Sequence, residues 1–291
     1  MIKAFFKKIF SFNIDIKEAF IPFVGLRINS LGDYSGTKEG VKRDTPIIIS
    51  LTSKREHFDI LPITIYSLLN QTLKPDRIIL WLDNESEDLT YLPYNITQFI
   101  KNGLEIKFIK NLGNYNKTIY PIKEFRDSII VTTSDNIYYP KNWLNKLYLS
   151  YITNPEDIHI HKAYKVIHTK ELSPKETWPK ATSNEKAQYD NYPDDIGGIL
   201  YPPNCFSKEA LREDIFLKYA PTEDVSWFWI MALVHNKKFR IVKNNISNFI
   251  KTDRWNFCLK KKEIEQTLSV NQQISNLLVF YKQNILHKLK K

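Results

Sequence analysis

From Pro46 onward, short apolar runs rich in β-branched residues alternate with helical patterns, and this alternation most restricts the fold. The first run is Pro46-Ile-Ile-Ile-Ser-Leu51; a helical pattern over 59–71 follows it and a second run covers 77–82. Runs that are apolar throughout are typical of strands buried on both faces. Strands that alternate with helices at short spacing predict an α/β fold with a mostly parallel central sheet flanked by helices.

The same alternation continues to about residue 245. Further strands are predicted over 104–109, 128–133, 157–168 and 239–242. Further helices are predicted over 93–101, after Pro140, over 222–235 and over 263–289. The intervening stretch 170–192 is polar and without period, so it predicts a long surface loop.

We expect three parts: an N-terminal arm over 1–43, the α/β domain over 44–245 and a basic helical tail over 246–291. Hydrophobic residues at 43% and charged residues at 25% are ordinary globular values, which exclude wholesale disorder. The formal net charge is +10, and residues 251–291 hold nine Lys or Arg against three acidic residues. This tail predicts an anionic partner, or else a surface that is merely solvated.

The N-terminal arm has its own pattern. Apolar residues recur at helical spacing, with lysines between them, at Ile2, Phe5, Phe6, Ile9 and Phe10. A short amphipathic helix of this kind lies in a membrane interface or packs on the protein's own core. No run of about 18 apolar residues exists, so we expect no transmembrane helix.

Several common sites are excluded by the motifs that the sequence lacks. GxGxxG, GxxxxGK[ST], GxSxG and HExxH are all absent. The two cysteines, Cys205 and Cys258, have no metal-ligand spacing, which argues against a zinc site and a disulfide framework and favours a reducing cytoplasm. His159 and His161 share a strand face without a third ligand, so we interpret them as structural.

Ligands of parallel α/β sheets bind beyond the carboxyl ends of the strands. In this chain those ends are Thr52-Ser53, Asp83 and Ser134-Asp135-Asn136. Asp135 follows an apolar strand directly, where a carboxylate can hold a divalent cation against a diphosphate. A turn or a helix cap explains the same residues.

Glu223-Asp224 opens a predicted helix and precedes Trp227. Acidic residues suit the positive end of a helix dipole, but one of them can instead act as a general base beside an aromatic-lined cleft. Gly197-Gly198 begins a rigid turn that could approach a ligand closely or simply connect two elements. Lys117 is a lone cation in a predicted loop.

Five segments together resemble bacterial glycosyltransferases, and more narrowly family-2-like enzymes of the GT-A fold that build lipooligosaccharide, capsule or other surface glycans. They are Ile49–Ser53, Leu68–Leu82, Ile130–Pro140, Gly197–Pro203 and Thr222–Trp227, in this order over residues 45–245. The resemblance implies an inverting transfer from a nucleotide sugar, commonly a UDP-sugar. The implied acceptor is a glycan or a lipid-linked saccharide.

The resemblance also implies roles for single residues. Those that would bind the nucleotide sugar are Thr52, Ser53, Asp83, Lys117, Ser134 and Asp135. Asp135 and Asn136 would hold a divalent cation, Mn²⁺ or Mg²⁺, at a DxD-type site.

Two further groups of residues receive roles from the resemblance. Asp224 would be the base that deprotonates the acceptor hydroxyl, with Glu223 in support. Gly197, Gly198 and Trp227 would shape the sugar and acceptor pocket.

The sequence departs from the family where three successive aspartates are usual, because it has Ser134-Asp135-Asn136. An alternative is therefore a degenerate module that binds nucleotide or glycan without turnover. A nucleotidyltransferase would want a Gly-rich basic loop after the first strand, and Thr52-Ser-Lys-Arg55 is not one. Nucleic acid is not an expected partner, because the excess charge clusters in the tail. We expect a cytoplasmic protein held peripherally on the anionic inner face of the membrane.

Overall fold

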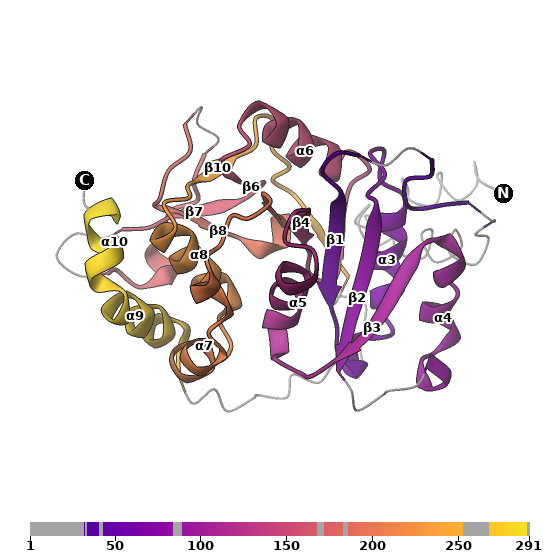
Figure 1. Cartoon of the computed structure of the whole chain (residues 1–291), viewed down its shortest axis with the longest axis horizontal. Coiled ribbons are helices and arrows are strands. Elements are labelled where there is room, and N and C mark those ends of the chain that lie inside the picture. Colours follow the sequence, from indigo (N-terminus) through magenta and orange to yellow (C-terminus); the bar gives the residue numbers. More distant parts are fainter. Residues whose placement is uncertain are drawn as a thin grey trace, which may run out of the picture.

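The computed structural model describes residues 32, 34–40, 43–83, 89–167, 172–182, 186–252 and 268–289. A seven-stranded sheet forms the centre, in the order β10-β6-β9-β4-β1-β2-β3 (Figure 1). Its strands are β1 (Ile47–Thr52), β2 (Arg77–Asp83), β3 (Leu104–Ile109), β4 (Ile129–Thr132), β6 (Ile158–Ile160), β9 (Ile199–Tyr201) and β10 (Phe239–Ile241). The expected α/β fold class, a mostly parallel central sheet flanked by helices, is confirmed.

Strand direction in the sheet decides which loops meet at one edge. β1 pairs in parallel with β2 and β4, β2 with β3, and β6 with β10. β9 lies antiparallel between β4 and β6, with Thr132 opposite Ile199. The chain that enters β9 therefore lies at the same edge as the chain that leaves β1, β2 and β4.

Each face of the sheet is covered by its own set of helices. Alternate residues of β1 and β2 point to opposite sides: Ile49 and Leu80 pack with one buried cluster, Ile48 and Ile79 with the other. Helices α3 (Leu61–Leu69), α4 (Tyr94–Thr97) and α6 (Trp143–Thr153) belong to the first cluster. Helices α5 (Asn116–Glu124), α7 (Glu213–Tyr219), α8 (Asp224–Val234), α9 (Val270–Phe280) and α10 (Lys282–Leu289) belong to the second.

Short elements complete the structure. Two small antiparallel sheets pair β5 (Ile137–Tyr138) with β11 (Ile250–Lys251) and β7 (Ala163–Lys165) with β8 (Asn191–Pro193). The 3₁₀ helices are η1 (Arg55–His57), η3 (Leu89–Tyr91), η4 (Ile100–Asn102), η5 (Gly113–Tyr115), η6 (Lys175–Thr177), η7 (Asp195–Gly197) and η8 (Lys208–Leu211). η1, η5 and η7 all lie in loops at the carboxyl edge of the central strands.

Two predicted segments differ from the structure. The strand expected over 157–168 is split into β6 and β7, because His161 binds the chain at Ile246 and Asn245 instead of continuing along the sheet. The loop expected over 170–192 is in part core: Trp178 and Tyr192 are buried and meet edge to face. The segment has a polar composition, which predicts a surface loop, but the burial of these two aromatic side chains attaches it to the core.

The described part of the predicted tail packs against the domain. α9 begins with a capping box, in which Ser269 and Gln272 each bond the other's backbone N–H. α9 and α10 lie beside α8 at one end of the molecule, with Ile274 and Ile285 fully buried (Figure 1). The N-terminal arm up to residue 31 and residues 253–267 lie outside the described residues. In the ranges that the structure describes, no helix has the length and apolarity needed to cross a membrane.

Candidate active site

A polar cleft of about 330 Å³ lies at the carboxyl edge of the sheet. Its walls come from the segments that follow β1, β2, β3 and β4, from the first turn of α5, and from η7 just before β9. The structure brings together in this cleft every residue predicted to bind nucleotide sugar or metal: Thr52, Ser53, Asp83, Lys117, Ser134, Asp135 and Asn136. Their separate roles stay predictions.

Buried hydrogen bonds fix the position of α5 against β1 and β2. The indole N–H of Trp81 donates to Ser50 Oγ (2.8 Å), and the Ser50 hydroxyl donates to the main-chain oxygen of Lys117 (2.6 Å). The Thr52 hydroxyl donates to the main-chain oxygen of Trp81 (2.9 Å). Because Ser50 and Trp81 are fully buried, these hydrogen bonds fix the position of the Lys117 backbone relative to β1 and β2.

Lys117 was predicted in a loop, but it lies in the first turn of α5 and is buried. Its Nζ is 3.3 Å from Asp224 Oδ2 and 3.5 Å from Asp195 Oδ2. Burial alone would lower the pKa of Lys117, but the two carboxylates outweigh burial and raise that pKa above its ordinary value. Lys117 is therefore a buried ammonium that joins the cleft to Asp224.

Asp224 is the first residue of α8, and only 6% of its side chain is exposed. Burial raises its pKa to about 6; Lys117 lowers it in part, and the nearby carboxylate of Asp195 raises it again. A carboxylate whose pKa lies just below neutrality is ionised at pH 7 and still takes up a proton readily. This environment suits a general base.

Glu223 belongs to a different network from its neighbour Asp224. Its Oε2 accepts a hydrogen bond from the Ser226 hydroxyl (3.3 Å) and lies 3.6 Å from Lys175 Nζ. Ser226 in turn bonds the hydroxyl of the buried Tyr192 (2.8 Å). Glu223 thus connects α8 to the segment around η6, and of these two neighbouring residues it is Asp224 that contacts Lys117.

Asp195 is a residue of the cleft that was missed from the sequence. It begins η7, its side chain is 39% exposed, and its Oδ2 is 3.5 Å from Ser134 Oγ as well as from Lys117 Nζ. It reaches this place because β9 runs antiparallel, so the segment before β9 lies beside the segment after β4. An acidic residue two positions before Gly197-Gly198 was the available signal, but its meaning depends on the direction of the next strand.

Asp135 is held by side chains from the segment after β1. Its Oδ2 accepts hydrogen bonds from the Ser53 hydroxyl (2.7 Å) and from Nδ1–H of His57 (2.8 Å). The Thr64 hydroxyl donates to its main-chain oxygen (2.8 Å). Asp135 is therefore the anchor of a small network, and His57 is a second cleft residue that sequence reasoning missed.

A divalent cation fits this donor set poorly. Mg²⁺ and Mn²⁺ favour several charged or strongly polar oxygens, whereas the predicted triplet offers one carboxylate between a hydroxyl and a neutral amide. One oxygen of that carboxylate already accepts two hydrogen bonds. Among the residues that the structure describes, no three His, Cys, Asp or Glu side chains are placed to hold a metal ion.

Three residues predicted to shape the acceptor pocket lie in the core instead. Trp227 is fully buried, and its indole N–H donates to the main-chain oxygen of Ala210 (3.0 Å). A Cβ on Gly198 would lie 2.5 Å from the ring of Trp143, whose Nε1–H donates to the main-chain oxygen of Gly197 (2.7 Å). Gly198 thus makes room for the side chain of Trp143.

The paired histidines are also buried away from the cleft. His159 bonds the Ser150 hydroxyl and the main-chain oxygen of Asn154, and His161 bonds the backbone at Trp143 and Ile246. Burial lowers the pKa of each to about 4. These contacts agree with a structural interpretation of both.

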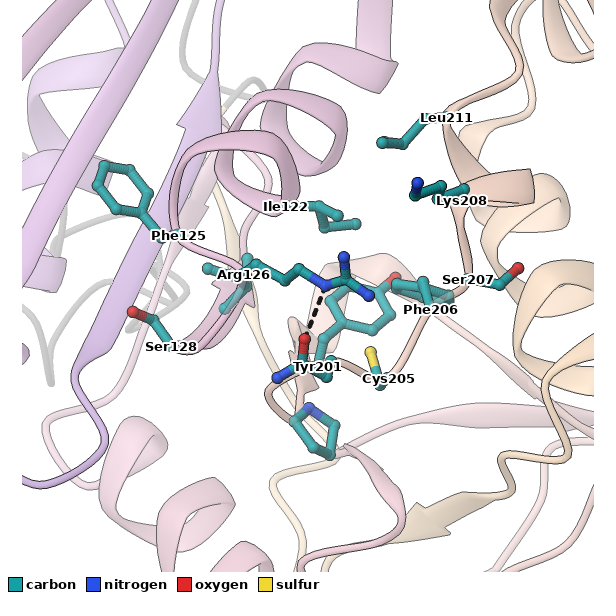
Figure 2. A pocket seen from close by; sticks show the side chains of 13 residues that line it. Ile122, Phe125, Arg126, Ser128, Tyr201, Cys205, Phe206, Ser207, Lys208 and Leu211 are labelled. Atoms are coloured by element: carbon teal, nitrogen blue, oxygen red, sulfur yellow. Dashed lines mark hydrogen bonds between the residues drawn. The ribbon is translucent and has the colours of Figure 1, made fainter.

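A second hollow, between the amino end of β4 and η8, is too small for a substrate. It holds about 50 Å³, and Figure 2 shows Ile122, Tyr201 and Phe206 around it, with the bond from Arg126 Nε to Asn204 Oδ1 (2.7 Å). Burial raises the pKa of the Cys205 thiol, which makes it unreactive.

Comparison with known proteins gives weak similarities of fold. No protein-family model matches the chain, and no curated protein matches it. The crystal structure of S. aureus TarS 1-349 aligns with a TM-score of 0.47 and 13% identity over 69% of this chain and 59% of that one. The crystal structure of a 4-diphosphocytidyl-2C-methyl-D-erythritol synthase from Anaerococcus prevotii DSM 20548 aligns with a TM-score of 0.41 and 14% identity. That alignment covers 69% of this chain and 89% of the synthase. At these values neither similarity identifies a family or assigns a function.

Proposed function

We propose that this protein is an inverting glycosyltransferase that moves a sugar from a nucleotide sugar to a hydroxyl of a glycan or glycolipid acceptor. The observation that carries the proposal is the buried Lys117–Asp224 pair beside a polar cleft at the carboxyl edge of the sheet. The resemblance of the motifs and the place of the cleft at that edge both support a nucleotide-sugar donor. A UDP-sugar is the first donor to test.

In this proposal the donor lies along the cleft, with its nucleoside toward β1 and β2. Thr52, Ser53 and Asp83 would meet the nucleoside, and Ser134 would lie near the diphosphate. Asp195, with its partly exposed carboxylate between Ser134 and Lys117, would accept hydrogen bonds from hydroxyls of the donor sugar. Carboxylate acceptors of this kind distinguish sugars by the position of their hydroxyl groups.

The reaction would be a single displacement at the anomeric carbon. The acceptor oxygen forms a bond to that carbon as the bond to the diphosphate oxygen breaks, and the nucleoside diphosphate leaves with the electron pair. Asp224 takes the proton of the acceptor hydroxyl. Lys117 favours the ionised form of Asp224, because it lies 3.3 Å away inside the protein.

Replacing Asp224 with Asn tests the proposal. Asn has nearly the same size but takes up no proton, so release of UDP from UDP-sugars should fall at least a hundredfold, while binding of UDP should change by no more than a few-fold. Asp214→Asn is the matched control, because Asp214 also lies in the first turn of a helix, α7, but pairs with Arg212 at the surface.

One result would contradict the role of Asp224, and another would contradict turnover itself. Equal turnover by wild type and Asp224→Asn would remove Asp224 as the base. Nucleotide binding by wild type with no turnover of any donor tried would favour the alternative, a module that binds nucleotide or glycan without reaction.

A further inference from the structure

We propose that His57, held by Asp135, takes the place of a divalent cation at the diphosphate of the donor. The imidazole would donate a hydrogen bond from Nε2 to a phosphate oxygen and stabilise the negative charge that develops as the nucleoside diphosphate leaves. This inference rests on the proposed function, because it assigns the chemistry of donor recognition in the same cleft.

The placement of His57 follows from three segments that meet at one carboxylate. Asp135 follows β4, Ser53 follows β1, and His57 is the last residue of η1. Both Ser53 Oγ and His57 Nδ1 bond the same Asp135 oxygen, at 2.7 and 2.8 Å. The His57 side chain is 22% exposed and lines the cleft. Asp135 therefore fixes the position of a ring that lines the cleft.

A cation at Asp135 would have to compete with this arrangement. To coordinate a metal ion through Oδ2, the carboxylate would lose the bonds from Ser53 and His57, and the ring would then face the cation. Among the neighbours, the main-chain oxygen of Asn136 already accepts a bond from Thr252 N–H (2.8 Å), and Ser134 brings only a hydroxyl. The carboxylate of Asp195, 3.5 Å from Ser134 Oγ, already faces the ammonium of Lys117.

The ring has the hydrogen-bonding groups that a phosphate needs. A carboxylate can only accept, so Nδ1 of His57 carries a proton in the bond to Asp135. None of the residues described in the structure hydrogen-bonds to Nε2. A phosphate oxygen at Nε2 is also an acceptor, so the ring that binds it carries protons on both nitrogens.

The electron balance of the step is that of a simple displacement. The acceptor oxygen supplies the pair for the new bond, Asp224 receives the hydroxyl proton, and the departing diphosphate keeps the pair of the broken bond. The His57 ring would stabilise this charge through its hydrogen bond from Nε2 without transferring its proton. Lys117 cannot serve alone, because its ammonium is already shared between Asp224 and Asp195.

Calorimetric titration with UDP, in EDTA and then in Mn²⁺, tests the inference on the full chain. Wild type should bind UDP equally in both. His57→Ala should lose about 10- to 100-fold in affinity for UDP, the usual effect of one hydrogen bond to a charged group, in both buffers. Its affinity for uridine, followed by ligand-observed NMR, should be unchanged, which shows that the cleft is still folded. His287→Ala, an exposed histidine on α10, is the matched control.

Asp135→Asn separates positioning of the imidazole from metal binding. If Asp135 positions His57, the Asp135→Asn variant should lose affinity for UDP in EDTA as well as in Mn²⁺. If Asp135 is instead a metal ligand, the variant should lose affinity for UDP in Mn²⁺ only. Wild-type binding that requires Mn²⁺, or His57→Ala that binds UDP normally, would overturn this inference and leave the glycosyltransferase proposal intact. Wild type that binds neither UDP nor uridine, nor GDP or ADP, would overturn both.

Discussion

Replacing Lys117 with Met should destabilise the protein strongly, and the loss should depend on pH. Methionine fills similar volume but leaves the carboxylate of Asp224 buried without its closest cation, at a side-chain exposure of 6%. Removing one partner of a buried ion pair commonly costs about 3 to 5 kcal/mol. The nearby carboxylate of Asp195 repels the ionised form of Asp224 and so adds to this cost.

The pH dependence follows from the pKa of Asp224. Burial raises this pKa from 3.8 to about 6 with Lys117 present, and that shift corresponds to about 3 kcal/mol. Because the folded state takes up the proton more readily than the unfolded one, the stability linked to this group is fully present below about pH 4. It is lost as pH rises through about 6. Lys117 lowers the pKa of Asp224, so removing Lys117 raises that pKa further. The loss of stability then occurs at higher pH.

Urea denaturation at pH 8 and at pH 5 measures the effect. Lys117→Met should lower the free energy of unfolding by about 3 to 5 kcal/mol at pH 8, and by much less at pH 5, where Asp224 is largely protonated. Lys123→Met on the same helix is the control, because Lys123 pairs with Glu213 at the surface and should matter by less than about 1 kcal/mol. An equal loss at both pH values would refute the reasoning.

Two further predictions concern the base and the glycine pair. Turnover should rise with pH through about 6 and fall roughly tenfold per unit below it, because Asp224 must be ionised; a flat profile between pH 5 and 7 would exclude it as the base. Gly198→Ala should cost about 2 to 4 kcal/mol of unfolding free energy, from a positive φ of 73° and a contact with the Trp143 ring. Gly40→Ala, at φ 83° with open space around it, should cost only about 1 kcal/mol, so equal losses at the two glycines would remove the Trp143 contact as the cause.

The central strands were predictable because burial on both faces leaves a plain record in the sequence. β1, β2 and β4 are short runs with apolar residues on successive positions, whereas β3 alternates apolar and charged residues; each of the four was predicted to within a residue or two. β9 has only three residues and follows a glycine pair, and this pattern predicts a turn and not a strand. α5 contains Pro121 and polar residues in its first turn, which hid the helix and placed Lys117 in a loop.

The predicted cleft residues come together because parallel strands carry their carboxyl ends to one edge, a rule that needs no knowledge of register. Trp227 shows a signal that was available and not used. α8 is apolar around nearly its whole circumference, and such a helix is buried on all sides, so its tryptophans belong to the core. Its amino end still brings Asp224 to Lys117, which places a candidate base and a core tryptophan three residues apart.

Asp195 and His57 could not be found from the sequence because their meaning is set by pairing between distant segments. Asp195 lies beside Ser134 only because β9 pairs antiparallel with β4, with Thr132 opposite Ile199. His57 contacts Asp135, 78 residues further along the chain, only because β1 and β4 are neighbours in the sheet. The resemblance to the glycosyltransferases implied a metal site at Ser134-Asp135-Asn136, whereas the triplet by itself is explained equally by a turn or a helix cap. In the folded chain the same carboxylate is bonded to an imidazole, and this bond makes His57 the first residue to test for donor recognition.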